Sequence, residues 1–469
     1  MPLPRSNANF TLAALTASLF LLACDGNDSG SKGNESGTAG ATSSTSNTGG
    51  VTSSTTTASG GLDGSTTSRG GQSAGGGAGG TTSSGGATGG ASSGGSTAST
   101  LGCAGMDPET GFDEIAFSDP NIRYVGRVYK STDSAAFAFP AVQIETVFEG
   151  DAIDMRLKDH GSTSATATNY YWVIVDGQAT KMAVCANREV YPLARGLGAG
   201  QHTVTIVKRT ESGPGGQANR GEGEFLGFRV RTGTALKPAA KPERLLEFVG
   251  DSITCGYGDE VSTTTPDNYK FTSAHEDSWN AYGALTARTL KADYVAVAAS
   301  GRGVIRNYGG FSGLVVPQIY EKTLHEDSAA PDWDHEGYSP DVVVVNLGTN
   351  DYSTGLTTDQ LDAHHAAFRQ GYVDFLTRIR EVHATATIVA VVGPMLSDSY
   401  PTGYQAWTSV KREVQAAVEA RHTANDPNVY YFALAPQSSP YGEDWHPTLA
   451  THQKMADALT PFIANLKGW

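Results

Sequence analysis

A long stretch near the N-terminus of this chain is almost devoid of apolar side chains. Gly, Ser and Thr supply 56 of the 76 residues from 25 to 100, and Val51 and Leu62 are the only larger aliphatic residues there. A segment of this composition cannot bury enough apolar surface to offset the entropy lost on folding. We therefore expect residues 25–100 to be a disordered linker, which as a flexible coil would span roughly 50 Å root-mean-square.

The rest of the chain is long enough for more than one folded domain. Residues 101–469 number 369, and at roughly 100–200 residues per domain this length predicts two domains or three. None of their apolar stretches approaches the roughly 20 residues of a membrane-spanning helix. The whole chain carries a formal charge of −15. An acidic surface without a basic stripe argues against nucleic acid as a partner, whereas a neutral polysaccharide would not be repelled.

Residues 1–24 have the features of an export signal. Arg5 supplies a positive charge, residues 10–22 are mostly apolar, and Leu21-Leu22-Ala23-Cys24 completes the segment. The apolar run is too short to span a membrane. The tetrapeptide resembles a bacterial lipobox, in which the signal is cut before a cysteine that is then lipidated. We expect an exported bacterial lipoprotein, anchored through Cys24 at the cell surface or the periplasmic face; the alternative is an ordinary secretory signal.

Three further cysteines follow Cys24, and an exported protein can pair two of them. We expect a disulfide between Cys103 and Cys185, because Cys255 lies close to the serine considered below. None of the cysteine spacings is typical of zinc, and the histidines form no metal-ligand pattern. No metal and no cofactor is therefore expected, and a monomer is the expected state.

Apolar and polar residues alternate with period two between residues 115 and 231. Ile153, Met155 and Leu157 alternate with charged residues, and Val204 and Ile206 alternate with threonines. Such alternation buries one face of a strand. Turn signals separate the segments, and no amphipathic helix interrupts them. We predict a β-sandwich or jelly roll over residues 112–235, followed by a hinge at the two prolines of residues 236–242.

After the hinge, apolar runs alternate with helical patterns. Near-continuous apolar strands separated by helices are typical of a parallel sheet that is covered on both faces. We therefore predict an α/β domain over residues 243–469, with helices over about 361–379 and 448–466. The predicted strands are residues 245–249, 294–298, 342–347, 387–392 and 429–434.

Residues suited to acyl transfer follow four of these five strands. Because the carboxyl ends of parallel strands meet at one edge of the sheet, we expect them to lie together. A base would take the proton of a serine there, and amide donors would stabilise the tetrahedral oxyanion. The residues are Ser252 in Gly250-Asp251-Ser252, Gly301 and Gly303, Asn350 in Gly348-Thr349-Asn350-Asp351, and His446 in Asp444-Trp445-His446-Pro447.

These blocks resemble those of the SGNH (GDSL) hydrolases, which are named for their Ser, Gly, Asn and His. The longer stretch VGDSITCGYG at residues 249–258, preceded by a β-sandwich, is similar to carbohydrate esterase family two, the two-domain acetyl esterases of plant polysaccharides. The resemblance covers about residues 112–466. It implies a flavodoxin-like parallel sheet with helices on both faces, preceded by a jelly-roll sandwich, and no cofactor.

The resemblance also implies roles for individual residues. Ser252 is the expected nucleophile and His446 the expected general base. The expected oxyanion hole consists of the Gly301 N–H, the Asn350 Nδ2 and the Ser252 N–H, with Gly303 as the fallback for Gly301.

The acid is a separate question, because SGNH enzymes usually carry Asp three residues before His. That position is Glu443 in this chain, and Asp444 lies two residues before His446. We expect Asp444 to orient the imidazole, with Glu443 as the next candidate. Some family-two enzymes work as a Ser-His dyad with a backbone carbonyl in this place, which is the third alternative.

Three aromatic residues are candidates for a wall on which a sugar could stack, namely Trp445, Tyr257 and Trp279. Core packing beside the site is the competing interpretation, and it is favoured for Trp279, which lies at helical spacing from Tyr282.

By resemblance, then, the chain is a serine esterase that removes O-acetyl groups from plant-type polysaccharides such as acetyl xylan. One alternative is a general lipase or acylesterase of the same fold. The other is a surface carbohydrate-binding protein whose hydrolase half no longer catalyses.

Overall fold

The structure is a computed structural model that describes residues 109–162, 164–212, 221–261, 269–325, 327 and 329–469. The predicted signal (1–24) with Cys24, the predicted linker (25–100) and Cys103 lie outside the described residues. Within them, no helix is both long enough and apolar enough to cross a membrane.

The first half of the described chain forms two six-stranded antiparallel sheets. One has the strand order β3-β4-β11-β6-β9, with β1 paired to β11, and the other has the order β12-β5-β10-β7-β8, with β2 paired to β5. The first sheet contains β1 (Phe112–Ala116), β3 (Tyr129–Lys130), β4 (Ala135–Phe137), β6 (Ile153–Asp159), β9 (Val190–Ala194) and β11 (Gly223–Arg231). The second contains β2 (Arg123–Val125), β5 (Gln143–Glu149), β7 (Tyr170–Val175), β8 (Gln178–Ala183), β10 (Gln201–Lys208) and β12 (Leu236–Lys237).

The apolar residues of the period-two pattern form the core between these sheets. Met155 and Leu157 of β6 are fully buried, and Val204 and Ile206 of β10 belong to the same hydrophobic cluster. The sandwich that the alternation predicted is therefore confirmed.

The second half is built on a parallel sheet of five strands in the order β14-β13-β15-β16-β17. The first strand along the chain lies between the second and the third, which is the flavodoxin-like order. The prediction of this fold is confirmed. The strands are β13 (Arg244–Gly250), β14 (Ala292–Ala298), β15 (Val342–Asn346), β16 (Thr387–Val392) and β17 (Val429–Ala433).

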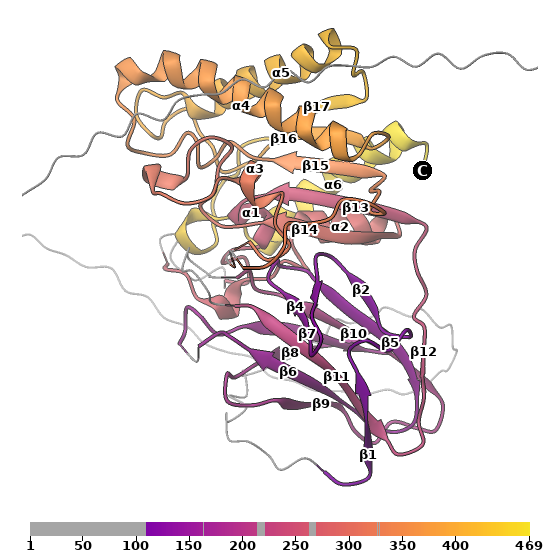
Figure 1. Cartoon of the computed structure of the whole chain (residues 1–469). Coiled ribbons are helices and arrows are strands. Elements are labelled where there is room, and N and C mark those ends of the chain that lie inside the picture. Colours follow the sequence, from indigo (N-terminus) through magenta and orange to yellow (C-terminus); the bar gives the residue numbers. More distant parts are fainter. Residues whose placement is uncertain (1–108, 163, 213–220, 262–268, 326, 328) are drawn as a thin grey trace, which may run out of the picture. The chain divides into compact units, whose positions relative to one another are not determined.

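Helices cover both faces of this sheet (Figure 1). Val342 and Val344 of β15 pack with residues of α2 and α6, whereas Val343 and Val345 pack with residues of α4 and α5. Every residue of β15 is buried for this reason. The helices are α1 (Ser252–Cys255), α2 (Tyr282–Thr289), α3 (Val316–Ile319), α4 (Leu361–Val382), α5 (Ala406–Thr423) and α6 (Leu449–Lys467), with short 3₁₀ turns η1 (Ser273–His275), η2 (Tyr308–Gly310), η3 (Thr358–Gln360) and η4 (Glu443–Trp445).

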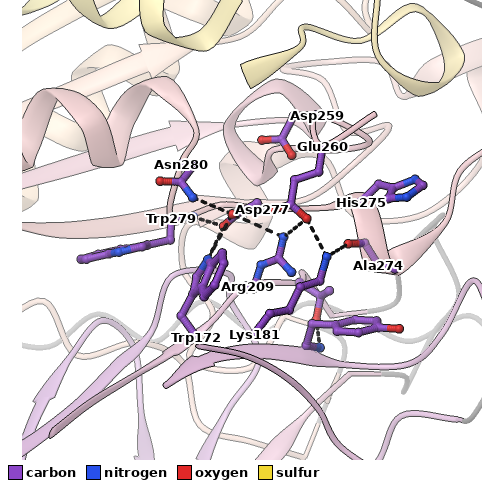
Figure 2. A network of polar contacts seen from close by, with 12 residues as sticks. Trp172, Lys181, Arg209, Asp259, Glu260, Ala274, His275, Asp277, Trp279 and Asn280 are labelled. Carbon is purple, nitrogen blue, oxygen red and sulfur yellow. Dashed lines mark hydrogen bonds and ion pairs between the residues drawn. The ribbon is translucent and has the colours of Figure 1, made fainter. Parts of the chain in front are cut away.

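Charged groups join the sandwich to the α/β domain. Arg209, just after β10, places Nη2 2.6 Å from Glu260 Oε2 and 3.3 Å from Asp277 Oδ2. Lys181 of β8 lies 2.6 Å from the same Glu260 oxygen. Figure 2 shows Arg209 directed at both carboxylates and Lys181 directed at Glu260, with the Trp172 ring beside Arg209. Because a buried charge is tolerated only when it is paired, these contacts tie the two halves together.

The cysteines after residue 108 differ in state. Cys185 is disulfide-bonded, whereas Cys255 is free and buried. Since Cys103 lies outside the described residues, its pairing with Cys185 stays a prediction.

Candidate active site

A tight turn between β13 and α1 sets the position of Ser252. The Asp251 side chain caps α1 by accepting a hydrogen bond from the Ile253 N–H at 3.0 Å. A Cβ on Gly250 would lie 2.0 Å from Thr254 Oγ1, so only glycine fits where the strand meets the helix. Ser252 thereby begins α1 at the carboxyl edge of the sheet.

His446 and Ser252, 194 residues apart in sequence, are in direct contact. His446 Nε2 lies 2.7 Å from Ser252 Oγ, and Nδ1 lies 2.9 Å from the backbone carbonyl oxygen of Glu443. Burial lowers the pKa of His446 to about 4, so the imidazole is neutral at neutral pH. With Nδ1–H donating to the carbonyl, the lone pair of Nε2 faces the serine hydroxyl, as a general base requires.

The structure differs from the expectation that the Asp444 carboxylate orients His446. Asp444 Oδ2 accepts a hydrogen bond from the Tyr257 hydroxyl at 3.0 Å, and Oδ1 lies 2.6 Å from Lys270 Nζ. The Glu443 side chain, the second candidate, is likewise engaged elsewhere, because it accepts hydrogen bonds from the N–H and hydroxyl of Thr272 and contacts His275. The third alternative, a backbone carbonyl, is the one that the geometry shows.

The backbone of η4 explains this arrangement. Asp444 and Trp445 both adopt positive φ angles, 47° and 62°. Non-glycine residues rarely occupy this region, and two in succession reverse the chain direction at a cost that the surroundings must balance. The Glu443 N–H donates to Gly258 O at 3.0 Å, and the Asp444 N–H donates to Tyr269 O at 2.7 Å. The turn held in this way points the Glu443 carbonyl at the imidazole.

Two of the predicted oxyanion donors are available. Across the part of the chain that the structure describes, the backbone N–H groups of Ser252 and Gly301 donate to no acceptor. Gly301 has a φ of +76°, which suits a glycine in the turn after β14. The N–H of Gly303, the fallback, is occupied, because it donates to Asn307 Oδ1 at 3.3 Å. The geometry therefore favours Gly301 over Gly303.

Asn350 lies at the same edge of the sheet. Gly250 of β13 pairs with Ala298 of β14 and with Asn346 of β15, so the segments that follow these strands are neighbours. Asn350 Nδ2 donates to Arg302 O at 2.8 Å and to Asp251 Oδ2 at 3.2 Å. The asparagine amide is thus fixed between the turn that carries Gly301 and the residue that precedes the nucleophile.

Sequence reasoning gave no role to Asp351, although it belongs to the block that contains Asn350. Its buried carboxylate accepts hydrogen bonds from the N–H groups of Val304, Ile305 and Arg306 at 2.8–3.1 Å. Asp351 therefore holds the segment after Gly301 in place. No local pattern marks this function, because the partners lie more than 40 residues away.

The aromatic candidates divide between the surface and the interior. Trp445 is half exposed, whereas Trp279 packs against the core, as its spacing favoured. Tyr257 stacks on His446 with ring centroids 4.1 Å apart, so it packs beside the imidazole. Three further exposed aromatic residues, which the sequence did not single out, are in segments that contact the site: Tyr269, Tyr308 and Phe311.

Comparison with known proteins agrees with both halves of the fold. A family model described as carbohydrate esterase 2 N-terminal matches residues 124–239, and one described as the GDSL-like lipase/acylhydrolase family matches residues 248–454. The cellulase/esterase CelE of Acetivibrio thermocellus is 36% identical over 355 residues, which are 75% of this chain and 40% of that protein. The chain therefore spans less than half the length of this relative.

Two further relatives match over most of their own length. An acetylxylan esterase / glucomannan deacetylase of Cellvibrio japonicus is 30% identical over 343 residues, which are 71% of this chain and 87% of that protein. The solved structure of a family two carbohydrate esterase from Clostridium thermocellum in complex with cellohexaose is 34% identical. The match covers 74% of this chain and 99% of the other, with a TM-score of 0.66. With its sandwich, its flavodoxin-like sheet and its Ser-His contact, this chain belongs to carbohydrate esterase family two of the SGNH hydrolases.

Proposed function

We propose that this protein removes O-acetyl groups from plant-type polysaccharides through an acyl-enzyme on Ser252. The observation that carries the proposal is the 2.7 Å contact between Ser252 Oγ and the neutral His446 Nε2. His446 takes the serine proton as Oγ attacks the acetyl carbonyl, and returns it to the sugar oxygen that leaves. Water, deprotonated by the same imidazole, then attacks the acetyl-serine, which releases acetate and restores the hydroxyl.

In this mechanism the Glu443 carbonyl takes the place of the acid of a catalytic triad. It fixes the imidazole tautomer by accepting the Nδ1–H at 2.9 Å, and its dipole favours the imidazolium that forms transiently. We assign catalysis to a Ser-His dyad oriented by this carbonyl.

The oxyanion of each tetrahedral intermediate would be held by the N–H groups of Ser252 and Gly301, together with Asn350 Nδ2. The two backbone donors are unoccupied among the described residues. An oxyanion would compete for the Asn350 hydrogen that Asp251 accepts at 3.2 Å, the longer of the two bonds that Nδ2 makes. Donors held in place before the reaction need no reorganisation as charge develops, which is why they accelerate it.

A neutral polysaccharide fits the surroundings of the site. One relative is named as an acetylxylan esterase / glucomannan deacetylase. The solved family two esterase from Clostridium thermocellum is in complex with cellohexaose. Exposed aromatic side chains in the segments around the catalytic residues offer apolar faces to sugar rings, and the net charge of −15 would not repel an uncharged glycan. The exposed aromatic residues around the site are Tyr269, Tyr308, Phe311 and Trp445.

The purified protein is expected to hydrolyse an aryl acetate and to release acetate from acetylated xylan and glucomannan. Ser252→Ala should abolish both activities, and a wild-type rate in this variant would overturn the mechanism. Faster hydrolysis of long acyl esters than of acetyl esters would instead favour the general acylesterase. Binding of the glycan without turnover would favour the binding protein.

We further propose that the enzyme is an exported lipoprotein held at a membrane through Cys24. The support is the order of the N-terminal sequence, in which a charged residue and an apolar run lead to Leu21-Leu22-Ala23-Cys24. Expression in a bacterial host with radiolabelled palmitate should label the wild type, and the variant Cys24→Ala should carry no label. Equal labelling of both proteins would disprove the anchor.

A further inference from the structure

The chain just after β10 of the sandwich is buried against the elements that carry the catalytic residues. Residues 208–212 are at most 3% exposed. The Ser278 N–H and hydroxyl donate to the carbonyls of Arg209 and Lys208, both at 3.2 Å. The neighbouring Asp277 N–H donates to the carbonyl of Gly256, the C-cap residue of α1, at 3.0 Å. The sandwich therefore contacts the hydrolase next to the C-terminal end of α1, the helix that begins with Ser252.

Glu211 extends from this segment between α1 and the turn that carries Gly301. Its Oε2 accepts the Ser300 N–H at 2.7 Å and lies 3.6 Å from the Cys255 Sγ, whose proton it can accept. Ser300 immediately precedes Gly301, and Cys255 is the last residue of the helix that begins with Ser252. One carboxyl group of the sandwich thus contacts both the segment of the nucleophile and the segment of an oxyanion donor.

The position of Glu211 is itself fixed. Its backbone N–H donates to Glu276 Oε1 at 3.2 Å. Burial raises the pKa of the Glu211 carboxyl to about 7 and that of Glu276 as well, and the buried Lys208 ammonium lies close enough to lower both. One oxygen of Glu211 and one oxygen of Glu276 each accept a hydrogen bond from a backbone N–H. These two carboxyl groups therefore hold the chain in place.

We propose that Glu211, a residue of the sandwich domain, is a positioning residue for the oxyanion hole of the hydrolase domain. By holding the Ser300 N–H, it sets the orientation of the following peptide, whose N–H belongs to Gly301. The bond to Cys255 keeps that peptide in register with α1 and hence with Ser252. This inference rests on the role of Gly301 proposed above, and it gives the sandwich a part in the chemistry.

The test compares Glu211→Met, which keeps the volume but removes the acceptor, with Glu211→Gln, whose amide oxygen can still accept the Ser300 N–H. For Glu211→Met we expect kcat on an aryl acetate to fall about 10- to 100-fold, because loss of one oxyanion donor costs about 10²–10³ and a displaced donor is weakened in the same way. KM should change less than about threefold, because no group that binds the ground state is removed. Affinity for an arylboronic acid, which forms a tetrahedral adduct with the serine, should fall with kcat. Glu211→Gln should keep kcat within about threefold of wild type.

Lys181→Met is the matched control, since it removes another charged contact between sandwich and hydrolase. It should lower the melting temperature and leave kcat and boronate affinity unchanged. If Glu211→Met does not fold, Glu211→Asp, which withdraws the oxygen by one methylene, should show a smaller loss of the same kind. Wild-type kcat in the folded variant, or a fall in kcat without a fall in boronate affinity, would overturn the inference. Failure of the wild type to hydrolyse any ester would instead overturn the proposed function.

Discussion

At the scale of the residue, the imidazole of the proposed catalytic centre is bonded to a backbone carbonyl rather than to an acidic side chain. His446 Nδ1 faces Glu443 O, and the nearby Asp444 carboxylate is bonded to Tyr257 and Lys270. An imidazole held in this way keeps its tautomer whatever the charge at residue 444. The two neighbouring acidic side chains are therefore supports of the turn.

The first prediction concerns Asp444. Removing the carboxylate of a catalytic triad costs roughly 10⁴ in kcat. Because Asp444 does not bond His446, we expect Asp444→Asn to lower kcat/KM on an aryl acetate by less than about tenfold, through weaker packing of Tyr257. Steady-state kinetics beside Ser252→Ala would measure this, and a loss of a thousandfold or more would restore Asp444 as the acid.

The pH dependence of activity follows from the burial of His446. Desolvation disfavours the imidazolium and lowers its pKa to about 4, below the 6.5 of an exposed histidine. The base is competent only when neutral, so kcat/KM should stay on a plateau as pH falls through 6.5 and decline only near pH 4. Initial rates on a short aryl ester, with enzyme recovery checked on return to pH 7, would test this. An acid limb centred at 6.5 would contradict the assignment.

The residues of the site could be predicted from sequence where a recognisable motif follows a strand, and Gly301 was found in this way as well as the residues with functional side chains. Ser252, His446 and Asn350 follow strands whose patterns were clear, and the structure brings them to one edge. A backbone carbonyl was only the third alternative for orienting His446, because the positive φ angles of Asp444 and Trp445, which direct the Glu443 carbonyl, are imposed by bonds to distant backbone groups. The contact of Glu211 with Ser300 spans 89 residues, and no local pattern encodes it.

At the scale of the element, the junction of β13 and α1 is the most constrained part of the site. The Cβ of Gly250→Ala would lie 2.0 Å from Thr254 Oγ1 and 2.7 Å from Thr254 Cβ. Relief requires a shift of the helix that begins with Ser252. We expect a loss of about 1–3 kcal/mol in the free energy of unfolding, typical of overpacking, together with a lower kcat.

A double-mutant cycle in urea would test this origin. Thr254→Ala in the Gly250→Ala background removes the nearer atom, so part of the loss should be recovered, whereas Thr254→Ala alone should destabilise by loss of its bond to Tyr282. Additive effects of the two substitutions would show that the strain lies elsewhere.

Elements with near-continuous apolar runs were the easiest to predict. All five strands of the parallel sheet lie where their apolar runs indicated, because helices cover both faces of the sheet and most strand positions are therefore apolar. The helix α5 was missed, although Val410, Val414 and Ala417 face the core at helical spacing. Small side chains make up much of that stripe, and polar residues separate them, so the pattern is weak.

At the scale of the whole molecule, we expect the charged contacts between sandwich and hydrolase to decide whether the two halves unfold together. Arg209 is fully buried and pairs with Glu260 and Asp277, and its guanidinium lies 4.8 Å from the centre of the Trp172 ring (Figure 2). The same segment carries Glu211 to the oxyanion turn. Displacement of this segment would therefore affect stability and catalysis at once.

The variant Arg209→Met removes the charge but keeps an apolar side chain under Trp172. It leaves the buried Asp277 carboxylate without its cationic partner, and breaking a buried ion pair in this way costs about 3–5 kcal/mol. We expect one cooperative calorimetric transition in the wild type, and in the variant a lower melting temperature with the transition split into two. Arg231→Met, which removes a pair on the exposed surface with Asp151, should cost less than about 1 kcal/mol and keep the single transition. If the two substitutions lowered the melting temperature equally, the halves would be joined by their apolar contacts alone. In that case kcat of Arg209→Met should remain at the wild-type value.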